Sequence, residues 1–295
     1  MNLDTALRQM QAAGLERLDS QLLLLLALGT PAVELHARRS WLLAHGDDPL
    51  PEATAAALAT LAQRRLDGEP LAYLAGHKEF HGLGLLVDAR VLVPRPDTET
   101  LVDWALEVLQ PLAGAGGTLQ ALDLGTGSGA IALALRHRIS SLEMDAVDAS
   151  QPALEVARHN AEHLALPLRL LHGSWFGPVA GQRYHCIVSN PPYIRSEDPH
   201  LQALAHEPTT ALVAGPDGLA DIRNIIDHAM EYLHPGGWLL LEHGYDQAQA
   251  VRALLLHAGF GQVQSRQDLA GHERCSGGCA SPQSPHGSSR AVEVK

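Results

Sequence analysis

The chain has 295 residues, 46% of them apolar, which is enough for one large domain or two ordinary domains with buried cores. Its formal net charge of −12 disfavours a long nucleic-acid footprint made through phosphates. Three cysteines give no disulfide framework, and neither a targeting segment nor a run long enough to span a bilayer is recognisable, so we expect a cytoplasmic protein without a membrane partner.

Residues 1–75 are rich in leucine and alanine and contain few β-branched residues. Apolar positions such as Leu3, Leu7 and Met10 recur at helical spacing, and glycines and prolines interrupt the run. This pattern predicts several short helices that pack as a small all-α bundle. The apolar run Leu22–Leu28 is interpreted as the buried face of a core helix.

Residues 76–96 have a different character, because apolar residues from Phe80 to Val93 stand among glycines. The pattern predicts a β-hairpin that links two domains. A helix is expected to begin near Pro96, since Asp97 and Glu99 would then lie in its first turn, where the helix dipole favours anions.

Residues 97–274 are expected to form a second domain in which apolar strands alternate with helices. The expected strands are Leu119–Leu124, Met144–Asp148, Leu168–His172, His185–Ser189 and Trp238–Glu242, and the expected helices are 130–138, 151–164, 219–233 and 246–257. This alternation predicts an α/β fold with a doubly wound, Rossmann-like parallel sheet. Ligands of such sheets bind outside the carboxyl ends of the strands.

A glycine-rich loop follows the first of these strands. Alternate glycines allow a tight turn and let a ligand approach the backbone, and the next helix offers unpaired N–H groups. The candidate ligand-binding residues of the loop are Asp123, Gly125, Thr126, Gly127, Ser128 and Gly129. A purely structural turn is the plainer alternative. Asp123 could equally orient the loop as an acceptor or meet a charged part of the ligand.

Two further candidates follow the second and third strands. Asp148 could accept hydrogen bonds from ribose hydroxyls, or it could simply cap the helix that begins after Ser150. Trp175 could cover an adenine ring, with a place in the core as its alternative.

The fourth strand ends in Asn190-Pro191-Pro192-Tyr193. Two prolines end the strand and leave the Asn190 side chain, the Pro191 carbonyl and the Tyr193 ring at the carboxyl edge. The two oxygens can accept both hydrogens of a planar amide or amine nitrogen, which holds its poorly nucleophilic lone pair towards a methyl donor. The aromatic ring can stack on the planar group. A rigid turn alone would explain the prolines but not the ordered set.

Several motifs together make the chain resemble the HemK/PrmC family of peptide chain release factor glutamine methyltransferases. They are Val93 to Glu99, the loop Asp123 to Gly129, the turn Ser189 to Tyr193 and Leu241 to Gly244. The resemblance extends to about Arg274 and implies a class I methyltransferase sheet, S-adenosylmethionine as cofactor and release factors as protein partners. The tetrapeptide alone indicates only an amino-methyltransferase, and its combination with Arg95 to Glu99 and the helical leader is more specific.

The resemblance also implies roles for the candidate residues. Gly125 to Gly129, Asp148, Trp175 and Asn190 would hold S-adenosylmethionine. Asn190, Pro191, Pro192 and Tyr193 would bind the substrate glutamine. We further hypothesise that residues 1–75 recognise the protein substrate.

The chain departs from the family pattern after Arg274, where a final apolar strand is usual. Residues 275–295 are rich in serine, glycine and proline and are expected to form a disordered or altered tail, in which only Ala291–Val294 could pair as a strand. A zinc site of His272, Cys275, Cys279 and His286 is disfavoured by its irregular spacing, and no metal is expected.

Three other functions compete with this interpretation. The first is methylation of a nucleic-acid base amine, which the acidic charge disfavours. The second is a nicotinamide-dependent oxidoreductase, because Gly125, Gly127 and Ala130 loosely fit the dinucleotide fingerprint. The third is a non-catalytic interaction protein that keeps a cofactor fold.

Overall fold

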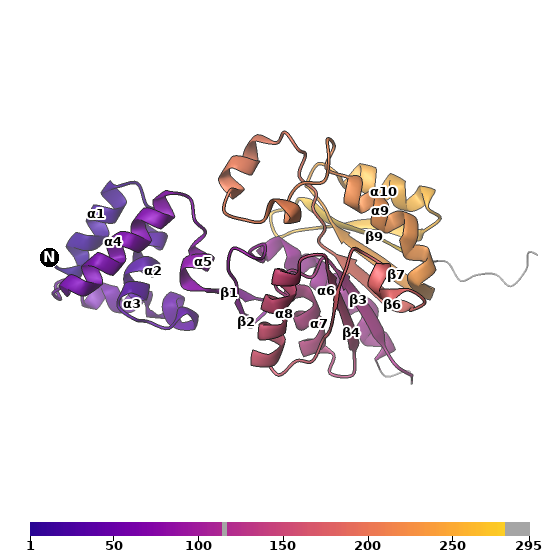
Figure 1. Ribbon diagram of the computed structural model, residues 1–295, viewed down its shortest axis with the longest axis horizontal. Coiled ribbons are helices and arrows are strands. Elements are labelled where there is room, and N and C mark those ends of the chain that lie inside the picture. Colours follow the sequence, from indigo (N-terminus) through magenta and orange to yellow (C-terminus); the bar gives the residue numbers. More distant parts are fainter. Residues whose placement is uncertain (114–116, 281–295) are drawn as a thin grey trace, which may run out of the picture.

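The computed structural model describes residues 1–113 and 117–280. It places the first 75 residues in a group of helices beside a seven-stranded sheet that carries helices on both faces (Figure 1). Across the described ranges, no helix is both long and apolar enough to cross a membrane.

The N-terminal helices pack around one central helix. Their bounds are α1 Leu3–Ala12, α2 Arg17–Ala27, α3 Leu35–Ala44, α4 Glu52–Leu66 and α5 Leu71–Ala75. Helix α2 contacts α1, α3 and α4, and its residues Leu22 to Leu25 are almost fully buried. The prediction that this leucine run belongs to a core helix is therefore confirmed.

A short antiparallel hairpin follows, made of β1 (His77–Phe80) and β2 (Leu83–Leu86). The hairpin is shorter than the expected 76–96, because residues 87–95 continue as an irregular segment. Val87, Val91 and Val93 of that segment are buried against Tyr73 of α5 and against α8. Near the expected Pro96 the chain enters a helical region, first as the 3-10 turn η2 (Pro96–Thr98) and then as α6 (Glu99–Leu109).

The large sheet confirms the predicted doubly wound α/β fold. Its strands are β3 Gln120–Leu124, β4 Glu143–Asp148, β5 Arg169–His172, β6 Tyr184–Ser189, β7 Leu233–Glu242, β8 Gly261–Gln267 and β9 Glu273–Cys279. They stand in the order β5-β4-β3-β6-β7-β9-β8, and the first five are parallel to one another. Because the chain order reverses between β3 and β6, a topological switch point lies there.

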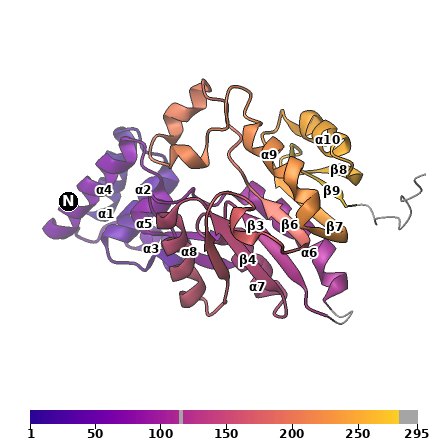
Figure 2. The same ribbon diagram turned by 45° about the vertical axis from the view of Figure 1, so that its right-hand side comes forward.

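Helices cover both faces of the sheet (Figures 1 and 2). Their bounds are α6 Glu99–Leu109, α7 Ala130–Arg138, α8 Gln151–His163, α9 Ala220–Ala229 and α10 Ala248–His257. Successive residues of one strand point into different cores: Ala121 packs with α6 and α7, and Leu122 packs with α9 and α10. This alternation explains why the central strands are apolar throughout.

The expectation of a tail from residue 275 is wrong for residues 275–280, and the sheet domain therefore extends beyond Arg274. Strand β9 lies between β7 and β8 and pairs antiparallel with both. The small residues of β9 give it the composition of a disordered tail, yet the fold requires them. A Cβ added at Gly277 would lie 2.6 Å from the Leu239 carbonyl oxygen, and one at Gly278 would lie 2.7 Å from the Phe260 Cβ atom. The suggested strand Ala291–Val294 and His286 lie outside the described residues.

Candidate active site

A cavity of about 560 Å³ opens at the carboxyl ends of the parallel strands. Its floor comes from the segments after β3, β4, β5 and β6, beside the topological switch point. Residues 90–98 and the segment after β6 supply further walls, including Arg95, Thr98, Pro208 and Ala211. Figure 2 shows the chain between β6 and α9 rising above the sheet towards the N-terminal helices. The volume falls in the range of about 300–1,000 Å³ that is usual for small-molecule sites.

The glycine-rich loop adopts the conformation that its glycines were expected to permit. Gly125, Gly127 and Gly129 have φ values of 74°, 55° and 83°, a left-handed region in which side chains are disfavoured. The N–H groups of Gly125 and Thr126 donate to the Val147 carbonyl oxygen at 2.8 and 3.0 Å. Residues 125–128 line the cavity, but Gly129 does not.

Asp123 lies below this loop and does not line the cavity, although the sequence made it a candidate ligand-binding residue. Its carboxyl is fully buried, and the Thr126 hydroxyl donates to Oδ2 at 2.7 Å. Oδ1 has no hydrogen-bond partner among the described residues. Burial raises the pKa of Asp123 to about 7, against the hydrogen bond from Thr126, which lowers it.

Asp148 lies at the end of β4 and lines the cavity. Its Oδ2 accepts from the Gly127 N–H and its Oδ1 from the Ser150 N–H, both at 2.8 Å. Burial raises its pKa, and these two backbone hydrogen bonds lower it. The helix cap is Ser150, whose hydroxyl accepts from the Ala153 N–H at 3.2 Å, so the alternative of Asp148 as the cap is wrong. Asp148 instead ties the glycine-rich loop to β4.

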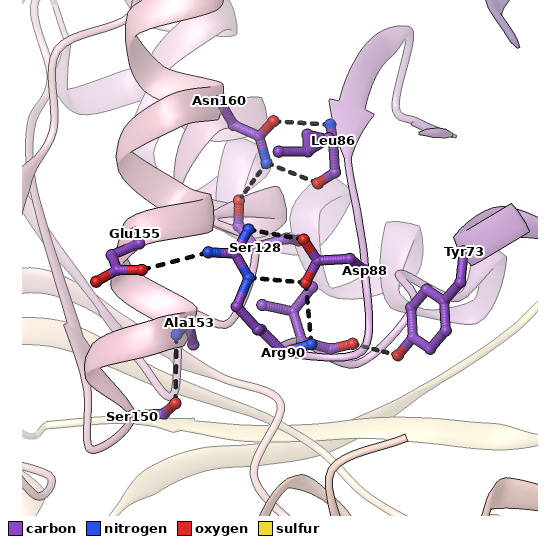
Figure 3. A network of polar contacts seen from close by, with 10 residues as sticks. Tyr73, Leu86, Asp88, Arg90, Ser128, Ser150, Ala153, Glu155 and Asn160 are labelled. Atoms are coloured by element: carbon purple, nitrogen blue, oxygen red, sulfur yellow. Dashed lines mark hydrogen bonds and ion pairs between the residues drawn. The ribbon is translucent and has the colours of Figure 1, made fainter. Parts of the chain in front are cut away.

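Asn160 on α8 braces the same loop from behind (Figure 3), a role that no sequence signal predicted. Its Nδ2 donates to the carbonyl oxygens of Ser128 at 2.9 Å and Leu86 at 3.1 Å, and its Oδ1 accepts from the Leu86 N–H at 2.7 Å. Asn160 as a whole is 1% exposed. One amide therefore fixes the hairpin, α8 and the loop relative to one another.

A second contact seen in Figure 3 connects the N-terminal helices to the cavity wall. The Tyr73 hydroxyl of α5 donates to the carbonyl oxygen of Val91 at 2.5 Å. Val91 and its neighbours Arg90 and Leu92 line the cavity. The guanidinium of Arg90 is itself held by Asp88, at 2.7 Å between Nη2 and Oδ2.

Trp175 lines the cavity after β5 and also packs against the core on the α9 side. The core alternative is therefore confirmed in part, and the role over an adenine ring stays a prediction. Its backbone φ of 46° is unusual for a bulky residue, and such conformations cluster at functional sites. A Cβ added at Gly125 would lie 3.8 Å from a carbon of the indole ring. The ring thus lies next to the first glycine of the loop.

The turn after β6 brings Asn190 and Pro192 to the cavity, whereas Pro191 and Tyr193 do not line it. The Ser189 hydroxyl anchors the turn by donating to the Leu124 carbonyl oxygen at 2.6 Å. Asn190 Nδ2 donates to the Thr98 hydroxyl oxygen at 3.3 Å. The Tyr193 ring is partly buried, and its hydroxyl donates to Glu242 at 3.3 Å.

Arg95 and Glu207 join two walls of the cavity by an ion pair. Glu207 is 5% exposed, and its second oxygen accepts from the Val93 N–H at 3.0 Å. The motif around Arg95 was visible in the sequence, but its partner stands 112 residues further along the chain. Asp221 of α9 also lines the cavity, and burial raises its pKa. Neither Glu207 nor Asp221 belongs to a sequence motif that would have identified it as a residue of the cavity.

These residues fit an adenosyl ligand. A carboxylate at the end of β4, an aromatic ring after β5 and a left-handed glycine-rich loop surround one space. The unpartnered Asp123 Oδ1 lies beneath the loop. Within the described chain, no cluster of three or more histidine, cysteine or acidic side chains could hold a metal ion.

Comparison with known proteins identifies relatives over both parts of the chain. The family model for the PrmC N-terminal domain matches residues 3–76, and that for the methyltransferase small domain matches residues 102–215. A release factor glutamine methyltransferase of Salmonella typhimurium is 44% identical over 283 residues, covering 95% of this chain and 98% of that protein. One of Bordetella pertussis is 48% identical over 268 residues, covering 90% and 95%.

Among solved structures, a methyltransferase of Pyrococcus furiosus is similar with a TM-score of 0.52. The two share 19% sequence identity, and the match covers 76% of this chain and 99% of that one. This likeness supports the methyltransferase fold of the sheet domain.

Proposed function

The chain belongs to the family of release factor glutamine methyltransferases, and on this premise we propose that it methylates the side-chain amide nitrogen of a glutamine in a peptide chain release factor, with S-adenosylmethionine as methyl donor. One observation carries the proposal. Asn190, at the end of β6, lines the same cavity as the glycine-rich loop and Asp148. A group that can orient an amide nitrogen thus shares one space with groups that suit an adenosyl ligand.

The proposed residues for S-adenosylmethionine are Asp123, Gly125, Thr126, Gly127, Ser128, Gly129, Asp148, Trp175 and Asn190. When bound, this ligand supplies a methyl group on positively charged sulfur, which makes the carbon electrophilic. Asp148 keeps free lone pairs beyond its two backbone contacts and would accept from ribose hydroxyls. Trp175 would cover the flat base. Asp123 and Gly129 do not line the cavity, and they would act indirectly by fixing the conformation of the glycine-rich loop.

The proposed residues for the glutamine are Asn190, Pro191, Pro192 and Tyr193. The side-chain oxygen of Asn190 and the carbonyl oxygen of Pro191 would each accept one N–H of the substrate carboxamide. Asn190 and Pro192 line the cavity, and Pro191 and Tyr193 adjoin them in the same turn, which supports this role. Holding both hydrogens directs the nitrogen lone pair and supports the positive character that develops during attack. Tyr193 would place its ring beside the planar amide.

We also propose that the N-terminal helices recognise the release factor. Two contacts support a fixed placement beside the cavity. His206, in the segment above the sheet, lies with Nε2 3.0 Å from the Asp67 carbonyl oxygen after α4, and Tyr73 binds the Val91 carbonyl. A protein bound to these helices would lie next to the cavity that holds Asn190.

The net charge of −12 supports a protein substrate over a nucleic acid. A cytoplasmic location is part of the same proposal. The cysteines Cys186, Cys275 and Cys279 are free and buried, which suits a reducing compartment.

The test is incubation of the protein with labelled S-adenosylmethionine and purified release factors, followed by mapping of the modified residue by mass spectrometry. We expect one methyl group on a glutamine amide. A parallel incubation with total RNA distinguishes the competing activity, because label in RNA and not in the release factor would reject the proposal.

The role of the helices is tested by deleting residues 1–69, which retains Tyr73 and its contact with Val91. We expect methylation of the intact release factor to fall sharply, while calorimetric affinity for S-adenosylmethionine stays nearly unchanged. Equal methylation of the intact partner by the truncated protein would exclude a recognition role.

A further inference from the structure

The motif from Leu241 to Gly244 ends β7 beside the Asn190 turn, yet none of its residues lines the cavity. Gln247, just beyond the motif, connects it to the turn. Gln247 is 5% exposed. Its Oε1 accepts from the Gly244 N–H at 2.8 Å, and its Nε2 donates to the Tyr193 carbonyl oxygen at 3.0 Å. One buried amide thus joins the end of β7 to the turn that follows β6.

The partners of Gln247 leave its carboxamide a single orientation. A backbone N–H can only donate and a backbone carbonyl oxygen can only accept, so Oε1 must face Gly244 and Nε2 must face Tyr193. Nε2 also lies 3.4 Å from the carbonyl oxygens of Asp217 and Gly218, in the chain that leads into α9. Three separate segments therefore converge on this amide.

The two prolines of the turn make an external anchor necessary. Pro191 and Pro192 have no N–H, so their backbone cannot donate the hydrogen bonds that fasten other turns. Their rings also fix φ, which leaves the segment between Ser189 and Tyr193 little freedom to bend. Fastening the two ends of this segment therefore determines where the whole turn lies.

Side chains from elsewhere on the sheet fasten both ends. At the start of the turn, the Ser189 hydroxyl donates to the Leu124 carbonyl oxygen at 2.6 Å. At its end, Gln247 holds the Tyr193 carbonyl oxygen. Asn190 stands between these two anchors and lines the cavity, so its position depends on both.

Gly218 closes on the same carbonyl from the other side. A Cβ added at Gly218 would overlap with the Tyr193 carbonyl oxygen and would lie 2.8 Å from Gln247 Nε2. The carbonyl is therefore confined between the amide of Gln247 and the backbone of Gly218, and it has no room to turn away.

Gly244, which anchors the amide, is itself held by the third residue of the motif. The Nδ1 atom of His243 lies 2.9 Å from the Gly244 carbonyl oxygen, and its Nε2 atom lies 2.7 Å from the Ser276 hydroxyl oxygen of β9. His243 is fully buried. The clamp on the turn thus rests on the packed strands β7 and β9.

We propose that Gln247 is a positioning residue, which holds the Tyr193 carbonyl and thereby keeps Asn190 and the Pro191 carbonyl where the substrate amide must meet them. Gln247 does not line the cavity and acts only through the backbone of the turn. The inference rests on the proposed function, because it is a reaction at this turn that requires the turn to be held in one place.

Gln247→Met removes the clamp with little change of shape. Methionine is unbranched like glutamine but has no N–H to donate, so the Tyr193 carbonyl oxygen and the Gly244 N–H both lose their partner. Gln249→Met is the matched control, because Gln249 is exposed on α10.

Gly218→Ala displaces the same carbonyl from the other side and leaves Gln247 unchanged. Gly215→Ala is its matched control. The two glycines have φ values of 73° and 76°, so both variants carry the same backbone strain. The Cβ added at Gly215 would lie 3.5 Å from the Ala220 Cβ atom, an ordinary contact.

The experiment measures single-turnover methylation of a saturating release factor, KM for that substrate and calorimetric affinity for S-adenosylmethionine. We expect Gln247→Met and Gly218→Ala to lower the rate on the order of a hundredfold, the usual effect of displacing a reacting group by about 1 Å. KM and cofactor affinity should stay within roughly threefold, because the misplaced turn acts mainly on the transition state. Gln249→Met and Gly215→Ala should match the wild type.

A second readout needs neither cofactor nor substrate. In the free protein, the side-chain NH₂ resonance of Asn190 should shift in Gln247→Met and Gly218→Ala but stay in place in the two control variants. If wild-type protein leaves release factors unmethylated, the proposed function fails, while this resonance still tests whether Gln247 positions the turn.

A wild-type rate in folded Gln247→Met would overturn the positioning role. A loss of rate with an equal loss of cofactor affinity would also overturn it, because Gln247 would then support the whole cavity rather than the turn. An unmoved Asn190 resonance has the same consequence. If Gln247→Met does not fold, the comparison of Gly218→Ala with Gly215→Ala decides by itself.

Discussion

The Asn160 side chain on α8 holds the Ser128 carbonyl oxygen of the glycine-rich loop at 2.9 Å from its Nδ2. The same amide makes two further hydrogen bonds to the backbone of Leu86 in the hairpin. Asn160 itself does not line the cavity, yet it fixes the loop that does.

Asn160→Ala should destabilise the fold, because one buried and two partly buried backbone groups lose their partner. We expect the free energy of unfolding in urea to fall on the order of 3 kcal/mol. Asn224→Ala, at an exposed position on α9, is the control and should change stability by less than about 0.5 kcal/mol. Equal midpoints for the two variants would show that the brace contributes nothing.

Asp148→Ala should weaken S-adenosylmethionine binding by a few kcal/mol at most, since two ribose hydrogen bonds disappear and the Gly127 N–H loses its acceptor. Asp148→Asn keeps one acceptor oxygen and should fall between alanine and wild type. Calorimetry gives the affinities. If a folded Asp148→Ala variant binds S-adenosylmethionine with unchanged affinity, Asp148 does not bind the ribose and serves only to hold the loop through Gly127.

Asn190→Ala should lower single-turnover methylation on the order of a hundredfold or more. Asn190→Asp should keep more activity than alanine but less than wild type, because it retains an acceptor and loses the NH₂ group that donates to Thr98. Tyr193→Phe should be mild, since the ring remains, and Tyr193→Ala should be severe. A wild-type rate in Asn190→Ala would remove the tetrapeptide from the mechanism.

The pH dependence of turnover should follow Glu242, whose pKa burial raises to about 7. The groups facing it are the hydroxyls of Thr98 and Tyr193, the Arg274 guanidinium and the Asp97 carboxylate. Protonation would give Glu242 a hydrogen to donate and disturb its contact with the Tyr193 hydroxyl, which lies 3.3 Å from Oε1. Single-turnover rates should therefore fall as the pH drops through about 7, and Glu242→Gln should show no such limb.

Stability should move in the opposite sense. The folded-state pKa of Glu242 lies above its ordinary value, so its contribution to stability is present at low pH and is lost as the pH rises through about 7. Buried Asp123 behaves alike. The difference in unfolding free energy between wild type and Glu242→Gln isolates Glu242. If the single-turnover rate falls at the same pH at which the wild type unfolds, the fall cannot be assigned to protonation of Glu242.

Gly277→Ala tests the placement of β9. The new Cβ would lie 2.6 Å from the Leu239 carbonyl oxygen and 3.1 Å from the Trp104 ring, so we expect a loss of about 1–3 kcal/mol or more in unfolding free energy. Gly177→Ala is the matched control, because nothing lies within 4 Å of its added Cβ. If both variants unfold at the same urea concentration, Gly277 does not lie in a packed central strand.

The sequence by itself determined the features that depend on local patterns. The alternation of apolar runs with helix-length segments predicted the parallel strands β3 to β7 and the helices between them. Glycines at alternate positions predicted the tight turn from Gly125 to Gly129, in which the structure gives all three glycines a positive φ, and two prolines predicted the end of β6. Each signal is read within a few neighbouring residues, because periodicity and backbone preferences are local properties.

Only the tertiary structure decided which distant side chains meet. Strand β9 has the composition of a loop, and its glycines make sense only once Leu239 and Phe260 lie against them. Thr98 and Asn190 stand 92 residues apart, and Tyr193 and Glu242 stand 49 apart. The packing of η2 and α6 on the sheet brings the first pair together, and the adjacency of β6 and β7 brings the second pair together. Strand order follows from how a whole sheet buries its two faces, a property of the assembled core that no single segment carries.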